Sequence, residues 1–328
     1  MSQQPPVCSI VIRAYNEEQH IGRLLAGITA QTIHDVQIIL VDSGSTDSTV
    51  RIARQFPVDV VTIKPEEFTF GRSLNFGIAQ AKADLVVMAS AHVYPVYPDW
   101  LAVMLEPFKD AQTALTYGKQ RGCETTQFSE HQIFHQWYPD QSVYRQPTPF
   151  CNNANAAIRR CLWQEHPYDE LLPALEDLAW SKWAQEQGYA ISYCAEAEVI
   201  HVHNESLEGI FNRYRREGMA FKQIYPHETF TRRDLYRLFA QNIFSDWREA
   251  RKQGRLGRDL QNIWRFRWRQ FSGTYRGYQQ SGPLTWQLKQ SFYYPRQPGL
   301  SGSGQKRPVA PIQYQEQAKW VGKGKAKG

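Results

Sequence analysis

Residues 7–18 read VCSIVIRAYNEE, and residues 36–47 read VQIILVDSGSTD. Each segment is an apolar run of strand length that ends in polar side chains, and a helix-length segment separates the two runs. Polar side chains at the carboxyl ends of successive buried strands mark the edge where an open α/β sheet binds a nucleotide. The two segments therefore predict a parallel sheet with a nucleotide site at its carboxyl edge.

The polar residues at these two strand ends have a chemical use. A carboxylate can accept from a base imide or a ribose hydroxyl, and the Gly-Ser-Thr turn lets the backbone come close while it starts the next helix. The alternative is a structural turn in which Ser45 or Asp47 caps a helix that begins near Ser48. On the first interpretation, the nucleotide contacts are Ala14, Asn16, Glu18, Asp42 and Ser43.

The first part of the chain alternates strands with helices. The clearest strands are residues 7–14, 36–42, 58–63 and 85–91, and helical spacing of apolar residues lies between them at 21–28 and 50–56. Residues 71–77 lead into a further helix before the fourth strand. This βαβαβ order predicts an α/β fold with a mostly parallel, Rossmann-like sheet flanked by helices.

Composition predicts a globular chain in a reducing compartment. The 328 residues are 42% hydrophobic, and the apolar runs are far shorter than the roughly 20 residues that a membrane-spanning helix needs. The amino terminus lacks a basic region followed by an apolar one, and the five cysteines form no CxxC pair. We therefore expect a cytoplasmic protein without a transmembrane helix.

Charge and pattern change near residue 206. Residues 1–206 carry 14 Lys and Arg against 24 Asp and Glu, whereas residues 207–328 carry 24 against 8. We expect a catalytic part at 1–206, a mainly helical region at 207–296 and a flexible basic tail at 297–328. One helical stripe carries Leu260, Trp264, Trp268, Phe271, Tyr275 and Tyr278, and beside it lie Arg258, Arg265, Arg269 and Arg276.

Two interpretations of this stripe stay open. A basic aromatic helix suits an anionic membrane surface, which would make the protein peripheral on the inner face of the membrane. It equally suits a helix that packs on the catalytic part, because long arginines readily cover apolar surface.

Two motifs together resemble a known family. The first is the series strand, Tyr-Asn-Glu-Glu, strand, Val-Asp-Ser-Gly-Ser-Thr-Asp. The second is the segment 149–160, PFCNNANAAIRR, followed by Glu176-Asp177. The combination resembles the family 2 glycosyltransferases, which adopt the GT-A fold, over residues 7–206. The resemblance implies an inverting enzyme that moves a sugar from a nucleotide-diphosphate donor to a hydroxyl of a glycan or lipid-linked acceptor in polysaccharide biosynthesis.

The resemblance also assigns residues. It makes Asp177 the general base and gives Glu176 the positioning of acceptor or sugar, although carboxylates at a helix start can be simple dipole partners. It places a basic side chain in the loop at Arg72, so that Arg72 and Asn75 would reach the phosphates. Sugar hydroxyls would be bound by Asn152, Asn153 and Asn155.

The expected metal motif is altered in this chain. The family usually has Asp-x-Asp after the strand at 85–89, and here the segment reads Ser90-Ala91-His92. One solution is a divalent cation, Mn or Mg, held by His92 with His201 or His203, and imidazole favours Mn, Co or Zn over Mg. The other is that cationic side chains supply the charge. We favour the cation, and we expect Ser90 to contact the nucleotide.

Rival functions remain open at this stage. A catalytically inactive protein that binds nucleotide sugars or glycans would also lack Asp-x-Asp. A nucleotidyltransferase is disfavoured, because acids and not a glycine-rich basic loop follow the first strand. Nucleic-acid binding through residues 207–328 is unlikely by comparison with a membrane surface. The absence of a Gln-x-x-Arg-Trp motif favours the transfer of single sugars.

Overall fold

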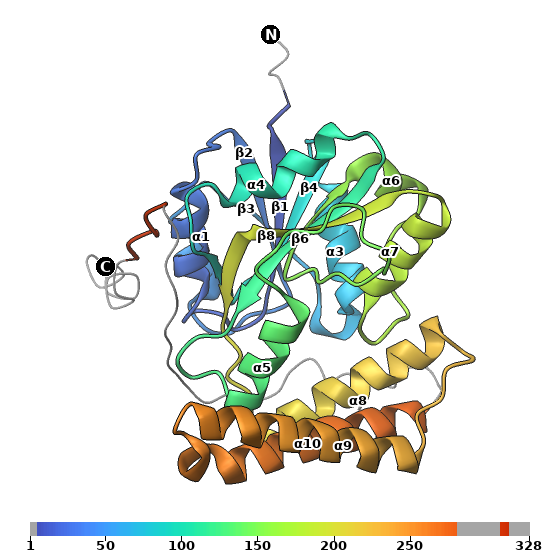
Figure 1. The fold of residues 1–328 in the computed structure, drawn as a ribbon. Helices are drawn as coiled ribbons and strands as arrows, with labels where there is room; N and C mark the ends of the chain where they lie inside the picture. Colours follow the sequence, from blue (N-terminus) through green and yellow to red (C-terminus); the bar gives the residue numbers. More distant parts are fainter. Residues whose placement is uncertain (1–4, 281–308, 315–328) are drawn as a thin grey trace.

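The structure is a computed structural model that describes residues 5–280 and 309–314. It contains one eight-stranded sheet with the order β3-β2-β1-β4-β7-β6-β8-β5. Helices cover both faces of the sheet, and a separate group of helices lies at the end of the molecule farthest from the amino terminus (Figure 1). The predicted α/β class is confirmed.

The first half of the sheet is parallel. It contains the four strands expected from the apolar runs, which are β3 (Asp59–Thr62), β2 (Val36–Asp42), β1 (Cys8–Ala14) and β4 (Leu85–Ser90). The register of β1 with β2 pairs Ala14 with Asp42. The polar carboxyl ends of these two strands therefore lie side by side, as residues 7–18 and 36–47 predicted. Apolar residues on both faces of β2, β1 and β4 are buried, which is typical of a parallel sheet covered on both sides, whereas the edge strand β3 is only half-buried.

The second half of the sheet is mixed. Its strands are β7 (Asn155–Arg159), β6 (Thr113–Arg121), β8 (Ala190–His201) and β5 (Val93–Pro95), and β7 and β5 run antiparallel to their neighbours. The pairing of β5 with β8 aligns Val93 with His201. This register brings His92 next to the segment that follows β8.

Successive side chains along each strand point to opposite faces of the sheet and pack into two separate hydrophobic cores. In β1, Ile10 and Ile12 enter one core, and Val11 enters the other. The first core is closed by α1 (Ile21–Thr29), α2 (Thr49–Ala53) and α4 (Trp100–Leu105). The second is closed by α3 (Phe70–Ala79), α6 (Arg160–Glu165) and α7 (Glu176–Glu186). Residues 71–77, which were expected to lead into a helix, lie within α3.

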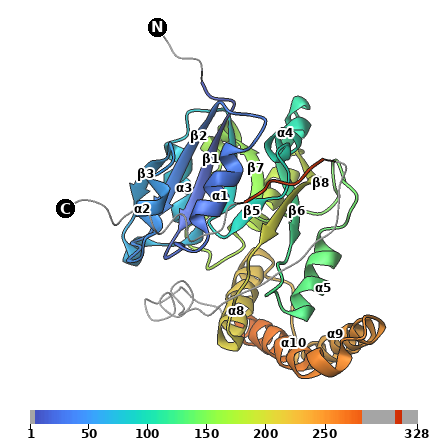
Figure 2. The ribbon, with the colours of Figure 1, turned by 90° about the vertical axis from the view of Figure 1, so that its left-hand side faces the viewer.

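The remaining helices form a layer beneath the sheet. They are α5 (Phe128–Trp137), α8 (Leu207–Ile224), α9 (Arg232–Lys252) and α10 (Leu256–Tyr278). Figure 2 shows α9 and α10 side by side at the edge of the molecule, with α5 and α8 between them and the sheet. The helical prediction for this region is confirmed as far as residue 278, and residues 281–296 lie outside the described residues. No helix in the described part of the chain is long and apolar enough to cross a membrane.

Two contacts hold this layer together. Glycines let α8 and α10 approach closely, since a Cβ at Gly273 would stand 2.5 Å from the Phe211 carbonyl oxygen and one at Gly218 would stand 2.7 Å from the Thr274 carbonyl oxygen. Between α9 and α10, Arg267 and Asp246 form a buried ion pair with N···O distances of 2.7 and 2.9 Å. Because all these groups are buried, α8, α9 and α10 form one packed unit.

Residues 309–314 lie along the edge of the sheet. The Ile312 N–H donates to the Val96 carbonyl at 3.1 Å, and the Tyr314 hydroxyl donates to the Pro95 carbonyl at 2.5 Å. The Tyr314 ring also packs edge-on against Tyr94. The rest of the tail from residue 297 lies outside the described residues, so its expected flexibility stays a prediction.

The glycine contact predicts a stability difference between two substitutions on α10. Gly273→Ala is expected to destabilise the fold by about 1–3 kcal/mol, because the added methyl meets backbone that can move only if the helices separate. Gly257→Ala on the same helix has no atom within 4 Å of the added methyl. It should leave stability unchanged or raise it by up to about 1 kcal/mol. Urea unfolding of both variants measures the difference, and equal values would contradict close packing of α8 on α10.

Candidate active site

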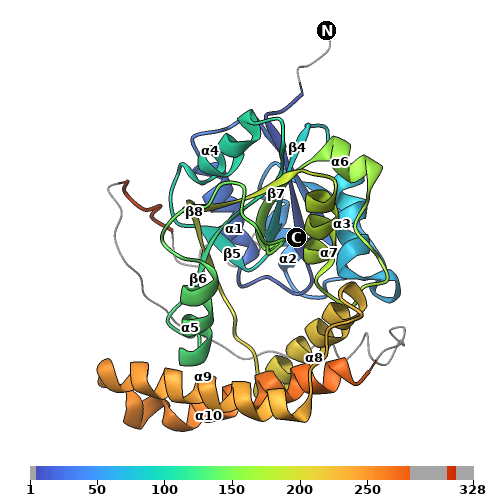
Figure 3. The ribbon, with the colours of Figure 1, turned by 45° about the vertical axis from the view of Figure 1, so that its right-hand side comes forward.

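A pocket of about 400 Å³ opens between the carboxyl edge of the sheet and the helical layer. Its walls come from the end of β1, the loop after β4, the loop before β7, the start of α7 and the segment after β8. The helical layer closes it with side chains from α5 and α8. Figure 3 shows α5 and α8 between the sheet and the pair α9 and α10.

Glu176 and Asp177 begin α7 and face the pocket. Leu175, directly before them, has a φ of 58°, a left-handed conformation that a leucine rarely adopts. Asp177 accepts from the Asn153 N–H at 2.9 Å and from the Leu178 N–H at 2.8 Å. Two backbone donors thus orient the carboxylate.

Burial changes the proton affinity of this carboxylate. Removal from water, followed by repulsion from the Glu176 carboxylate, raises the pKa of Asp177 from 3.8 to about 7, although its backbone donors and Arg13 oppose the shift. Glu176 is itself held by Arg13, whose guanidinium lies 3.3 Å from a Glu176 oxygen. A carboxylate whose pKa lies near neutrality suits a general base.

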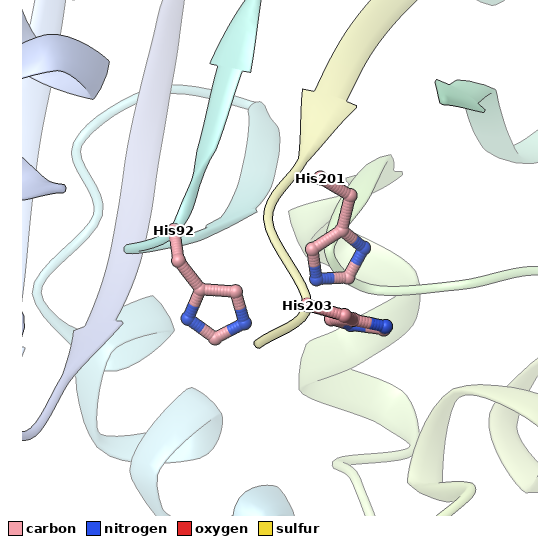
Figure 4. Close-up of side chains that lie close together, drawn as sticks. All are labelled: His92, His201 and His203. Atoms are coloured by element: carbon pink, nitrogen blue, oxygen red, sulfur yellow. The ribbon is translucent and has the colours of Figure 1, made fainter. Parts of the chain in front are cut away.

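Three histidines lie together where β5 begins and β8 ends (Figure 4). Their ring centroids are 5.1 Å apart for His92 and His201, 3.9 Å for His201 and His203, and 6.1 Å for His92 and His203. One ligand atom from each lies within 4.8 Å of the others. The group is therefore compact enough to surround a single cation.

Each imidazole is oriented by a partner on its Nδ1. The partners are a Glu17 oxygen 2.7 Å from His92, the Gln120 amide oxygen 2.6 Å from His201, and a Glu130 oxygen 2.8 Å from His203. Such partners fix the orientation of each ring and leave Nε2 to face a metal, although the His92 Nε2 also lies 3.1 Å from the Ser90 hydroxyl.

The properties of His201 fit a metal ligand. Its Nε2 is buried and has no hydrogen-bond partner among the described residues. Burial, then the neighbouring His203 and His92, hold the pKa of His201 well below its ordinary value, so the ring stays neutral. A neutral imidazole with an unsatisfied Nε2 is the form that binds a metal. The residues present therefore fit a divalent cation.

The helical layer contributes charged residues that sequence reasoning missed. Arg213 and Arg216 on α8 line the pocket together with Glu217, and Arg216 lies over the Phe70 ring at 4.8 Å. Arg213 donates to Glu130 on α5 at 2.6 Å. The basic run of residues 213–216 begins ten residues after His203 and could have indicated a role at the site. The boundary at residue 206 stays a prediction, but the pocket extends across it.

The predicted nucleotide residues separate into two groups. Ala14, Ser43 and Ser90 line the pocket, as do Glu17 and Arg13, which had no assigned role. The others are outside its lining and carry hydrogen bonds within the fold: Asn16 accepts from the Thr46 N–H, Glu18 from the Ser48 N–H, and Asp42 from the Gly44 and Ser45 N–H groups. These bonds give the three residues a structural role in the turn, and their contacts with a nucleotide stay predictions.

Arg72 and Asn75 also lie outside the pocket lining. Arg72 is exposed near the start of α3. Asn75 accepts from the Trp163 indole at 2.8 Å and donates to the Tyr168 carbonyl at 2.9 Å, so it fastens α3 to the segment before α7.

The three asparagines expected at the acceptor site have different surroundings. Asn152 lines the pocket, and Asn153 lines it while its Nδ2 lies 3.4 Å from Glu176. Asn155 is fully buried and does not line the pocket. Its amide accepts from the Trp100 indole at 2.8 Å and donates to the Ala197 carbonyl at 2.9 Å. Asn155 therefore joins β7 to α4 and β8.

Known proteins share this fold and part of this sequence. Residues 9–166 match the family model described as glycosyl transferase family 2. The O-antigen chain rhamnosyltransferase RfbN of Salmonella typhimurium is 26% identical over 64% of this chain and 71% of its own length. The rhamnosyltransferase WbaN of Salmonella anatum is 29% identical over 58% of this chain, and the match spans 64% of its own length.

A solved structure supports the same architecture. The mannosyltransferase PcManGT from Pyrobaculum calidifontis, solved with GDP-Man and Mn2+, superposes with a TM-score of 0.59 at 15% identity, over 84% of this chain and 88% of its own. The sheet therefore has the GT-A architecture that the sequence predicted. Within this fold, residues 9–166 are similar to glycosyl transferase family 2.

The structural role of Asn155 can be tested separately from the site. Asn155→Ala should destabilise the protein by about 2–4 kcal/mol, because it leaves the Trp100 indole and the Ala197 carbonyl buried without partners. Asn152→Ala, a pocket residue that is only partly buried, is the matched control and should cost about 1 kcal/mol or less. Urea unfolding measures both. If Asn155→Ala kept full stability and weakened acceptor binding, Asn155 would be an acceptor ligand instead.

Proposed function

We propose that the protein transfers a single sugar from a nucleotide-diphosphate donor to a hydroxyl of a glycan or lipid-linked acceptor, with inversion at the anomeric carbon. The observation that carries this proposal is the placement of Asp177, with its raised pKa, in a pocket that also holds three clustered histidines. The base and the charge-stabilising groups that the reaction needs thus border the same space.

The reaction follows from these positions. Asp177 takes the proton of the acceptor hydroxyl as its oxygen bonds to the anomeric carbon, and the bond from that carbon to the donor phosphate breaks in line. The nucleoside diphosphate leaves with the electron pair. Glu176, held by Arg13 and Asn153, positions the acceptor or the sugar. Direct displacement inverts the anomeric centre.

The leaving diphosphate carries negative charge that must be stabilised. The residues that would hold a divalent cation are His92, His201 and His203, and a bound cation would act as a Lewis acid on the phosphate oxygens. Arg13, Arg213 and Arg216 add fixed positive charge along the same pocket. Imidazole donors favour Mn, Co or Zn over Mg.

The sugar we propose is a 6-deoxyhexose such as rhamnose. The relatives RfbN and WbaN are named as O-antigen rhamnosyltransferases, which also supports a role in polysaccharide assembly. Apolar side chains that suit a methyl group line the pocket, among them Phe68, Ile133, Phe134 and Trp137. A lipid-linked acceptor would be met at a membrane surface, where we propose that the protein acts as a peripheral enzyme.

Turnover tests the role of Asp177. With a panel of nucleotide sugars and product detection by mass, Asp177→Asn should lower kcat/KM by about 10²–10⁴-fold, because the base is lost. Asp84→Asn removes an exposed carboxylate from the sheet domain and should have no effect. No product from any donor, with nucleotide binding unaffected by Asp177→Asn, would support an inactive binding protein instead.

The pH profile gives a second test of the same residue. A base is active when deprotonated, so kcat/KM should rise with pH to a plateau above the pKa of about 7 and fall below it. Glu176→Gln removes the repulsion that helps to raise this pKa, so the rise of kcat/KM with pH should occur at lower pH in this variant. A rise that stays in place in Glu176→Gln would argue against Asp177 as the titrating group.

Metal removal tests the histidine cluster. A chelator should abolish transfer, and Mn or Co should restore it more effectively than Mg, because the donors are imidazoles. His201→Ala should weaken Mn binding, measured by calorimetry, by at least about tenfold. His34→Ala, an exposed histidine elsewhere, serves as the control and should bind Mn normally. Full activity in the chelator would assign the charge stabilisation to the arginines.

A further inference from the structure

A row of apolar side chains, three of them exposed and three half-buried, lies along α9 and α10. We call Tyr236, Phe239, Trp247, Leu260, Trp264 and Trp268 the aromatic seam. Tyr236 is 61% exposed, Trp264 45% and Leu260 44%. None of the seam residues lines the pocket. Large apolar residues exposed together, and not singly, mark an interaction surface.

Contacts across the two helices make the seam continuous. Trp264 and Trp268 stack with their centroids 6.2 Å apart, and the Phe239 ring meets Trp268 at 5.5 Å. Tyr236 lies 6.5 Å from Trp268. At the other end, the Trp247 indole donates to the Leu260 carbonyl at 3.3 Å. The three exposed side chains thus adjoin three half-buried ones, and the six together form a single surface that spans both helices.

Arginines flank the seam on α10. Arg258, Arg265, Arg269 and Arg276 share one side of the helix and are exposed. Within the described residues, no carboxylate pairs with any of the four. Residues 232–278 contain twelve Arg and Lys against four Asp and Glu.

The four acidic residues of α9 and α10 are already paired. The pairs are Asp234 with Arg237, Asp246 with Arg267, Glu249 with Lys252 and Asp259 with Arg255. The positive charge beside the seam is therefore not neutralised by these helices. An anionic partner would complement it.

We propose that the aromatic seam and the flanking arginines dock the protein on a membrane that carries anionic lipid headgroups. Tryptophan and tyrosine prefer the headgroup level of a bilayer, where the ring is buried and its polar atom stays wet. Arginine forms paired hydrogen bonds with phosphate oxygens. Helices with this combination lie in the plane of the interface and do not cross it.

The docking surface and the pocket belong to one packed unit. α10 carries the seam and meets α8 at the glycine contacts, and α8 supplies Arg213 and Arg216 to the pocket. One or two helix diameters, roughly 10–20 Å, would separate the headgroups from the pocket. This inference rests on the proposed function in one respect, that the acceptor is lipid-linked. Docking would then hold the pocket at the distance from the membrane surface at which the glycan of a lipid-linked acceptor lies.

Vesicle binding tests the proposal directly. The full chain is floated with vesicles of phosphatidylcholine alone or with about 30% phosphatidylglycerol, at low and at high salt. We expect binding only to the anionic vesicles, weakened by salt because exposed charges are screened. The triple variant Arg258→Gln, Arg265→Gln and Arg269→Gln should lose about 100-fold in affinity, from about fivefold for each arginine.

Control variants distinguish the effect of the docking surface from the effect of the protein's net charge. The control for charge is a triple variant of the sheet domain, which combines Arg51→Gln, Arg54→Gln and Lys82→Gln at exposed positions. It removes the same charge and should change vesicle affinity by less than about threefold. Tyr236→Gln, Leu260→Gln and Trp264→Gln together should lower affinity at least about tenfold. Leu171→Gln, at an 84% exposed leucine, is their control. Circular dichroism and thermal unfolding check that each variant is folded. If a triple variant unfolds, Arg265→Gln replaces the arginine triple and Trp264→Gln replaces the seam triple.

Several outcomes would overturn the proposal. They are equal binding to neutral and anionic vesicles, no vesicle binding, and equal losses in seam and control variants. Retention on DNA without vesicle binding would assign the surface to a nucleic acid. A dimer that Trp264→Gln dissociates, without vesicle binding, would assign it to a second copy of the chain. Transfer to a soluble acceptor, measured without vesicles, reports on the proposed function independently.

Discussion

Glu130 lies on α5 with 4% of its surface exposed, and its carboxylate accepts from His203 at 2.8 Å and from Arg213 at 2.6 Å. Burial would raise the pKa of Glu130, but His203 and Arg213 outweigh it and lower the pKa to about 2. The carboxylate therefore stays ionised at neutral pH, and its contribution to stability is lost only as the pH falls below the ordinary value of 4.5 toward 2. One buried charge thus ties α5, the end of β8 and α8 to each other. Without it, Arg213 would keep only its ion pair with Glu205, and the Nδ1 of His203 would lose its hydrogen-bond partner.

Much of the sheet could be predicted because its signals are local. The apolar runs at 36–42 and 85–90 have strand length, and burial on both faces keeps them uninterrupted. Asp177 and the histidines could be named from sequence because the segments that carry them resemble the Glu-Asp and metal regions of family 2 glycosyltransferases. Their meeting in one pocket depends on the strand order, and the antiparallel pairing of β5 with β8 is what joins His92 to His201.

The rest of the site depends on packing between distant segments. Asn153 and Asn155 are two residues apart in an asparagine-rich segment, yet one faces the pocket and the other is enclosed by Trp100 and Ala197. Nothing in the composition of the segment distinguishes them. Arg213 and Arg216 were missed for a related reason, because the change of charge near residue 206 suggested a separate region. Their role appears only once α8 is seen to close the pocket.

The segment at residues 309–314 has a consequence for the behaviour of the purified protein. β5 is the last strand of the sheet, and an edge strand presents unpaired backbone groups to other chains. Ile312 and Tyr314 occupy two carbonyls along this edge, and Tyr314 also covers Gly27 on α1. A version shortened before residue 309 would uncover those carbonyls and the apolar surface beside them. Residues 309–314 thus protect this edge of the sheet from pairing with other chains. The solubility of a shortened protein will depend on whether these residues are kept.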